Sequence, residues 1–149
     1  MSGRTPSQTV GPFFAIAFSR ERQCDVVPGG SVQIVGHVFD GDGPVHDAIV
    51  ELWQQGEHGT LWGRCGTGPD GSFELVTERP PDGVADVQVF ARGLLRHLVT
   101  RLYFPGVSDE VLDAVEAERR ETLVAREEDG ALRFDIHLQG DRETVFFAV

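Results

Sequence analysis

Histidine is the residue type in this chain best suited to binding a metal, but its spacing does not favour a site. The five histidines are His37, His46, His58, His97 and His137. None occurs in a His-x-His or His-x-x-x-His pattern, so no strand or helical turn presents two imidazoles together. His97 and His137 fall within expected strands, yet neither has an evident second ligand. We therefore expect no metal site on this chain.

The sequence also lacks the motifs of nucleophilic catalysis and phosphate binding. No Gly-x-Ser-x-Gly elbow is present, and Cys24 and Cys65 have no suggestive neighbours in sequence. No glycine cluster opens a helix together with Lys and Ser or Thr. The remaining carboxylates are expected on solvated helix and turn surfaces rather than as an acid–base pair: Glu116, Glu118, Glu121, Glu127 and Glu128.

Arg92 is the clearest polar candidate for ligand binding. It follows the apolar run that ends at Phe90, which places a guanidinium at the mouth of an expected strand. A guanidinium fork can bind a carboxylate through two parallel hydrogen bonds. The alternative, an ordinary exposed turn arginine, remains open from the sequence.

The opening segment, residues 5–14 (TPSQTVGPFF), carries no charge in a strongly acidic chain. Pro6 and Pro12 fix φ and remove two donors, and Gly11 permits unusual backbone angles. We expect neither a helix nor a central strand here. Two interpretations stand: the segment docks against another surface, or its apolar residues join the core of this chain. The residues concerned are Phe13, Phe14, Ile16 and Phe18.

Short alternating segments separated by turn residues predict an all-β sandwich. Expected strands cover residues 31–39, 48–54, 72–77, 86–90, 98–104, 132–138 and 143–147. In the first of these, Val32, Ile34, Gly36 and Val38 share one face. Residues 56–71 are glycine-rich and are expected to form a long loop. One helix is expected over residues 108–120, with acidic residues in its first turn and arginines in its last.

Composition limits the function classes. The 149 residues fit one domain, and the formal charge of −11, with no lysine, disfavours nucleic acid and anionic membranes as partners. Two cysteines in no paired motif fit a reduced, cytoplasmic protein. No secretory signal and no apolar run of membrane-spanning length is visible.

An ordered set of motifs resembles the intradiol ring-cleavage dioxygenases. The set is 5–13 (TPSQTVGPF), 36–43 (GHVFDGDG), 50–54 (VELWQ), 89–93 (VFARG), 100–104 (TRLYF), 119–125 (RRETLVA), 133–136 (RFDI), 139–140 (QG) and 143–147 (ETVFF). No single motif is decisive, but their order is kept from residue 5 to the C-terminus. The resemblance implies one Greek-key β-sandwich domain over residues 1–149, with an extended N-terminal segment 1–18 and one short helix.

Catalytic chains of this family bind ferric iron through two tyrosines and two histidines in a His-x-His pattern. The only tyrosine here, Tyr103, lies inside an expected strand. Val84 and Asp86 stand at the histidine positions, the first tyrosine position falls near Leu61, and the second falls in residues 80–83, which contain no tyrosine. The resemblance therefore implies an alpha-type chain without iron, inactive alone, with Fe(III) on a partner beta chain.

In such hetero-oligomers the alpha chain helps to wall the active site. The residues carried over by the resemblance are Thr9, Gly11, Pro12, Phe13 and Arg92. They would help to bind a small aromatic dihydroxy acid, with Arg92 near its carboxylate, in aromatic compound catabolism. No catalytic residue is expected on this chain.

Two departures from the family pattern bear on the site. Residues 54–64 and 77–84 are shorter than in typical members, and such loops carry site geometry.

The alternative to a dioxygenase subunit is a protein of another functional class, a self-associating β-sandwich module without an enzymatic role. An independent enzyme with a different metal comes third, because the ligand spacing is poor.

Overall fold

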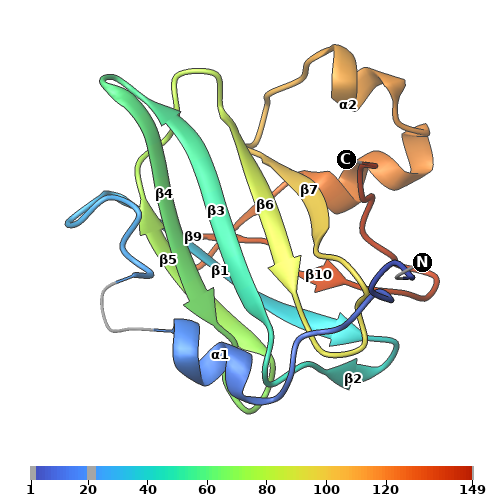
Figure 1. The fold of residues 1–149 in the computed structure, drawn as a ribbon. Helices are drawn as coiled ribbons and strands as arrows, with labels where there is room; N and C mark the ends of the chain where they lie inside the picture. The colour runs from blue at the N-terminus through green and yellow to red at the C-terminus, as the bar shows by residue number, and fades with distance from the viewer. Residues whose placement is uncertain (1–2, 20–22, 149) are drawn as a thin grey trace.

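The computed structural model describes residues 3–19 and 23–148, and its strands form two sheets that pack face to face (Figure 1). The first sheet, called the β1 sheet, has the order β10-β1-β9-β8, with β2 and β5 also paired to β1. The second, the β3 sheet, has the order β4-β3-β6-β7. The expected sandwich is therefore confirmed. No helix within the described residues is long and apolar enough to cross a membrane.

The strands of the β1 sheet are β1 (Val32–Asp40), β2 (Gly43–Pro44), β5 (Ser72–Thr77), β8 (Arg126–Glu128), β9 (Ala131–Arg133) and β10 (Ile136–His137). Strand β1 is central, with β5 antiparallel on one side and β9 and β10 parallel on the other. Ile34, Gly36 and Val38 are buried on one face, as the alternation predicts. Gly36 is required there, because a Cβ would lie 1.9 Å from the Phe134 carbonyl oxygen.

The strands of the β3 sheet are β3 (Ile49–Gly56), β4 (Gly59–Gly66), β6 (Val84–Phe90) and β7 (Leu98–Tyr103). The predicted loop at 56–71 is wrong, because β4 pairs with β3 from Ile49–Gly66 to Gly56–Gly59. Glycine lowers intrinsic strand preference, but cross-strand contacts outweigh it here. The rings of Trp53 and Trp62 lie 5.6 Å apart, and both indoles donate to the buried carboxylate of Glu51.

The expected helix at 108–120 is broken into α2 (Glu110–Ala114) and the 3-10 helix η1 (Ala117–Leu123). Asp109 caps α2 by accepting the Leu112 N–H at 2.8 Å. Arg120 donates from Nε to the Val115 carbonyl at 2.8 Å and from Nη2 to that of Asp113 at 2.6 Å. These bonds satisfy carbonyls that a continuous helix would have bonded internally, so the break is stable.

The two C-terminal predictions are also corrected. The expected strand at 132–138 is interrupted between β9 and β10, because the Asp135 carboxylate, rather than a backbone carbonyl, accepts the His37 N–H at 3.0 Å. Residues 143–147 lie within the described part of the chain but form only an isolated bridge, Phe147 with Val99. Glu127 and Glu128 are exposed, as expected, but lie on β8.

The core fills the space between the sheets, with large side chains from both. Ile34, Leu75, Leu52 and Val87 are among its fully buried members. A smaller cluster of Tyr103, Leu112 and Leu123 lies where α2 and η1 cover β7. The N-terminal arm, defined as residues 3–18, passes the end of the sandwich where β6 finishes (Figure 1).

Candidate functional site

The N-terminal arm and the turn after β6 meet in one hydrogen bond. The Thr9 hydroxyl oxygen accepts the Gly93 N–H at 2.9 Å. Gly93 has a φ of 90°, a conformation that favours glycine, and it follows Arg92 directly. Two candidates that are far apart in the sequence, Thr9 and Arg92, therefore lie on one surface. The hydrogen bond thus places the arm next to the turn that carries Arg92.

Arg92 is held by a residue that the sequence did not single out. Its Nε forms an ion pair with an Asp47 carboxylate oxygen, just before β3. The Asp47 side chain is 15% exposed, whereas that of Arg92 is 47% exposed. A pair that engages Nε leaves the Nη nitrogens as donors for a second carboxylate. No spacing rule links Asp47 to Arg92, so only the fold could reveal this contact.

The arm ends in a short helix, α1 (Phe13–Phe18), which the sequence analysis did not expect. Pro12 is its N-cap and sits in the right-handed helical region, where the missing N–H costs nothing. The prediction that residues 5–14 exclude a helix is therefore wrong for Phe13 and Phe14. The reason is that proline disrupts a helix interior but suits a helix start.

The apolar residues of α1 do not join the core as a group. Phe13 is 76% exposed and Ile16 is 74% exposed. Phe14 packs its ring against Phe90 at 5.8 Å, and the Arg64 guanidinium lies 5.5 Å from the ring centroid of Phe18. One edge of α1 thus anchors the arm to β6 and β4, while Phe13 and Ile16 face outward together with the exposed Gly11 and Pro12.

The two positions implied for the histidine ligands border a cleft of about 500 Å³ at the opposite end of β6. Val84 and Asp86 both line it, together with Trp53, Gln54 and Asp82. Arg101 enters the same cleft and pairs through Nε with Asp86 Oδ1 at 3.2 Å. Valine offers no donor, and the fixed cation of Arg101 beside Asp86 opposes a metal cation at this place. These residues do not fit a ferric ion.

Tyr103 does not replace the missing ligands. Its hydroxyl donates to Asp109 Oδ1 at 2.9 Å, and the side chain is fully buried. Burial raises the pKa of Tyr103, because desolvation disfavours the phenolate, and the hydrogen bond to Asp109 acts in the same direction. The phenol therefore remains protonated and holds α2 on β7.

The sequence predicts that His97 and His137 lie within strands, and the structure changes one of these two assignments. His97 is exposed and precedes β7 rather than lying in a strand, and its ring stacks on Phe90 at 5.2 Å. His137 lies in β10 as expected. Burial lowers the pKa of His137, and the nearby charge of Arg142 lowers it further. Over residues 3–19 and 23–148, no three His, Cys, Asp or Glu side chains converge on a possible metal position.

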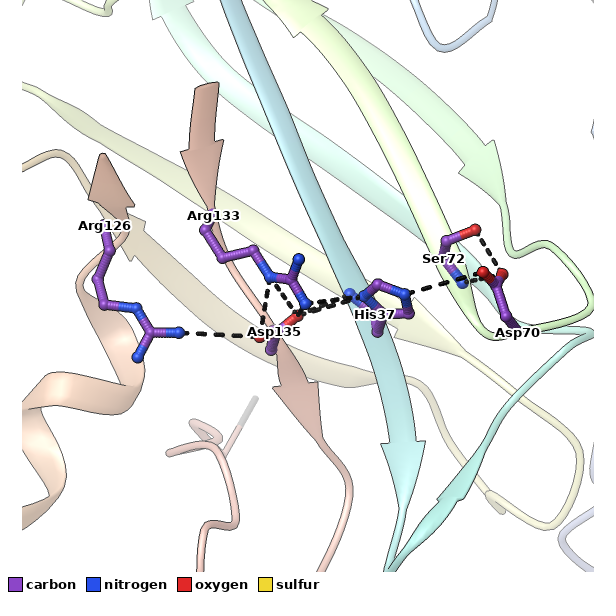
Figure 2. Close-up of polar contacts among 6 residues, drawn as sticks. All are labelled: His37, Asp70, Ser72, Arg126, Arg133 and Asp135. Carbon is purple, nitrogen blue, oxygen red and sulfur yellow. Dashed lines mark hydrogen bonds and ion pairs between the residues drawn. The ribbon is translucent and has the colours of Figure 1, made fainter. Parts of the chain in front are cut away.

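His37 belongs to a polar network on the β1 sheet (Figure 2). Its Nδ1 lies 3.0 Å from Arg133 Nη2, and Arg133 Nε reaches both Asp135 oxygens at 3.0 Å. On the other side, His37 Nε2 lies 4.0 Å from Asp70, which accepts the Ser72 hydroxyl at 2.6 Å. Bonds from Ser72 lower the pKa of Asp70, so this carboxylate stays ionised.

The order of groups in this network excludes a Ser-His-Asp mechanism. In such a triad the imidazole must contact the serine hydroxyl to accept its proton. Here Asp70 stands between Ser72 and His37, so on this side the imidazole faces the Asp70 carboxylate and not the serine hydroxyl, as Figure 2 shows. The network instead joins β1 to the segment between β9 and β10, where Asp135 interrupts the ladder.

Comparison with known proteins identifies the family. A Burkholderia cepacia protein named protocatechuate 3,4-dioxygenase alpha chain is 37% identical over 192 residues, covering 98% of each chain. A Pseudomonas putida protein of the same name is 35% identical over 193 residues, covering 96% of this chain and 95% of its own. This chain belongs to the family of protocatechuate 3,4-dioxygenase alpha chains. It is an alpha-type subunit of an intradiol dioxygenase, a family that implies iron in the complex.

The alpha-chain relatives are longer in places. An alignment over 192 residues exceeds the 149 residues of this chain, so the relative carries segments that this alpha chain lacks. This agrees with the expectation of shortened loops, although the alignment length does not place the gaps at residues 54–64 or 77–84.

Solved structures confirm the fold of the alpha chain. A chlorocatechol 1,2-dioxygenase from Pseudomonas putida matches with a TM-score of 0.51 and 18% identity, covering 90% of this chain and 70% of that chain. An intradiol ring-cleavage dioxygenase from Tetranychus urticae matches with a TM-score of 0.54 and 14% identity, covering 91% and 93%. No family model matches the chain.

Proposed function

We propose that this alpha-type chain forms one wall of the substrate pocket of a protocatechuate 3,4-dioxygenase, whose Fe(III) is held by a partner beta chain. The complex would cleave protocatechuate with O₂ between its two hydroxylated carbons and yield 3-carboxy-cis,cis-muconate. The observation that carries this proposal is the hydrogen bond between Thr9 and Gly93, which brings the arm beside Arg92. The relatives named protocatechuate 3,4-dioxygenase alpha chains support the substrate and the pairing with a beta chain.

The proposed contribution of this chain to the reaction is binding and orientation. Arg92, oriented by Asp47, would bind the substrate carboxylate, which fixes the ring relative to the partner's iron. Thr9, Gly11, Pro12 and Phe13 would line the pocket and exclude water with backbone and ring edges. Gly11 and its neighbours are exposed on this chain, so they are free to face another subunit.

The exposed apolar side chains of α1 support a subunit interface at this place. Phe13 and Ile16 would be costly to leave in water, and aromatic anchors are typical of the buried centre of an interface. The arm carries no charge over residues 5–14, which also suits a buried contact.

We further propose that residues 1–149 form one domain, with residues 1–18 as its N-terminal extension. We propose that the complex works in the cytoplasm.

The experiment is co-expression of the full chain with a candidate protocatechuate 3,4-dioxygenase beta chain. We expect a stable heteromeric complex that contains iron and cleaves protocatechuate, and an isolated chain that does neither. Size measurement of the isolated chain separates this proposal from a self-associating module. Stoichiometric iron and ring cleavage by the isolated chain, or self-association with no binding to the beta chain, would contradict it.

A further inference from the structure

The ion pair between Asp47 and Arg92 continues the register of two paired strands. At this end of the sandwich the β3–β6 ladder joins Ile49 to Phe90. Two residues beyond this pair on each side stand Asp47 and Arg92, so the same antiparallel register leads into their ion pair. Ala91, next to Arg92, is buried in the core, which fixes the backbone on the arginine side. Strand pairing therefore brings these two side chains together.

The loop that carries Asp47, residues 45–48 between β2 and β3, is braced by one side chain that follows β4. The Thr67 hydroxyl donates to the Val45 carbonyl at 2.6 Å and accepts the Ala48 N–H at 3.0 Å. The Thr67 N–H donates to the Ala48 carbonyl at 2.9 Å, which continues the β3–β4 register by one residue. Asp47 lies between the two residues that Thr67 holds, so the loop backbone is fixed on both sides of it.

We propose that Thr67 is a positioning residue for the substrate carboxylate, acting through Asp47 on Arg92. This inference rests on the proposed function of Arg92 as the residue that binds this carboxylate. Asp47, held in place by its loop, engages Nε and so sets the plane of the guanidinium. A two-point contact with a carboxylate requires that plane to be correct.

The consequence of this arrangement is selectivity for a substrate that carries a carboxylate. A loop released from Thr67 lets Asp47 move, and the guanidinium of Arg92 turns with it. Small errors of placement are costly for a bound group, so a carboxylated substrate is disfavoured while one without a carboxylate is not. Thr67 is uncharged, and its replacement therefore changes the geometry around Arg92 without changing the charge.

The test uses the full chain in complex with a protocatechuate 3,4-dioxygenase beta chain. Thr67→Val removes the hydroxyl with little change in volume, and it should lower kcat/KM for protocatechuate by roughly 3- to 10-fold. The loss for catechol should stay below about 2-fold, because catechol has no carboxylate to misplace. Thr67→Ser keeps the hydroxyl and should restore the activity on protocatechuate. Equal losses on both substrates, or wild-type kinetics in the valine variant, would overturn the proposal.

Thr122→Val is the matched control. The Thr122 hydroxyl also bridges two backbone segments, because it donates to the Arg119 carbonyl at 2.8 Å and accepts the Val145 N–H at 3.2 Å. Both threonines are half-buried, so the two valine variants should lower the Tm of the free chain to a similar extent. Only Thr67→Val should change the ratio of kcat/KM for the two substrates. The same change of ratio in both variants would assign it to lost stability and contradict the proposal.

Arg92→Ala separates this inference from the proposed function. Equal losses on both substrates in Arg92→Ala would refute the carboxylate role of Arg92 itself. A selective loss in Arg92→Ala with none in Thr67→Val would overturn the positioning role alone. In the double variant, Thr67→Val should cost less than a further 2-fold or about that on protocatechuate, because the residue that it positions is gone. Fully additive losses would place the effect of Thr67 elsewhere.

Asp47→Glu is a second variant, which keeps the charge and moves the carboxylate by one methylene. It leaves the hydrogen bonds of Thr67 in place, so it tests the link to Arg92 even if Thr67→Val does not assemble with the beta chain. We expect a loss of roughly 3- to 10-fold in kcat/KM for protocatechuate and little loss for catechol. Wild-type selectivity in Asp47→Glu would overturn the proposed action through Asp47.

Discussion

Arg92 and Asp47 show how a single contact can define a binding residue. An exposed arginine samples many rotamers, but an ion pair at Nε restricts its orientation. The Asp47 carboxylate is the more buried partner, so its position next to β3 is set by the fold. Asp47 therefore orients the more exposed guanidinium of Arg92. The proposed role of Arg92 therefore depends on a residue that no motif identified.

Replacing Arg92 tests its role towards the substrate carboxylate. In the complex with a beta chain, Arg92→Ala should lower kcat/KM for protocatechuate by about 10-fold or more, because a charge-assisted hydrogen bond contributes about 1.5–3 kcal/mol. For catechol, which has no carboxylate, the loss should stay below about 3-fold. Arg92→Lys keeps the charge without the fork and should give an intermediate value. Equal losses on both substrates would remove the proposed role.

Thr9 tests the position of the arm separately from charge. Thr9→Val removes the acceptor for the Gly93 N–H with little change in volume, while Thr9→Ser keeps it. Loss of one hydrogen bond of about 1 kcal/mol should lower kcat/KM for both substrates by roughly 3- to 10-fold in the valine variant only. Steady-state kinetics of the complex measures this, with the Tm of the free chain as a control for folding. A valine variant with wild-type kinetics would show that the bond does not position the arm.

At the scale of elements, the helical region depends on one carboxylate. Asp109 caps α2, accepts the Tyr103 hydroxyl and pairs with Arg101 Nη1 at 3.3 Å. Burial by itself raises the pKa of Asp109, but the bonds from Leu112 and Tyr103 and the charge of Arg101 outweigh it, so the pKa is lowered. This group therefore adds stability above its unfolded pKa, and the gain is lost as the pH falls through the lower folded pKa.

Asp109 variants separate the cap from the charge. Asp109→Ala should lower the free energy of unfolding at pH 7 by about 2 kcal/mol, since it removes the cap and the acceptor of the buried Tyr103 O–H. Asp109→Asn keeps an acceptor and should lose less. Urea unfolding should show the gap between wild type and the asparagine variant closing as the pH falls below about 4, the unfolded pKa of an aspartate. A gap that stays constant over this range would contradict the charge contribution.

The β3–β4 hairpin shows why the local sequence predicted a loop where the structure has a strand. Residues 56–71 contain several glycines and little periodicity, so the sequence favours a loop. In the fold, Glu51 collects hydrogen bonds from both indoles and from Arg64 at 2.5 Å across the two strands. These partners belong to both strands, so their contribution exists only after the strands have paired.

At the scale of the whole molecule, the arm leaves apolar surface that the chain itself does not cover. Phe13→Asp or Ile16→Asp should weaken binding to a beta chain by about 30-fold or more, because aromatic and aliphatic anchors at interface centres contribute about 2 kcal/mol or more. The Tm of the free chain should hardly change, since both side chains are exposed. Size-exclusion chromatography and titration measure the binding.

A matched control for this interface is Ala117→Asp. Ala117 is exposed on η1, which lies against β7, whereas α1 lies against β4 at the other edge of the same sheet. It adds the same charge, so it should leave binding to the beta chain intact. Loss of binding in the control as well would assign the effect to net charge rather than to the arm.

The sequence by itself determined the sandwich, the central alternation of β1 and the lack of iron-ligand residues at the family positions. These depend on side-chain period, turn residues and donor chemistry, which are local properties. Ordered motifs also pointed to the family that the relatives confirm.

Only the tertiary structure decided which distant residues meet. It paired Asp47 with Arg92 and Thr9 with Gly93, started a helix after Pro12, and turned a glycine-rich loop into β4. Each of these depends on groups brought together by strand pairing or sheet packing, whose energy no local window contains. The physical reason is that period and propensity act over a few neighbouring residues, whereas a site is formed wherever the folded backbone makes separate segments converge.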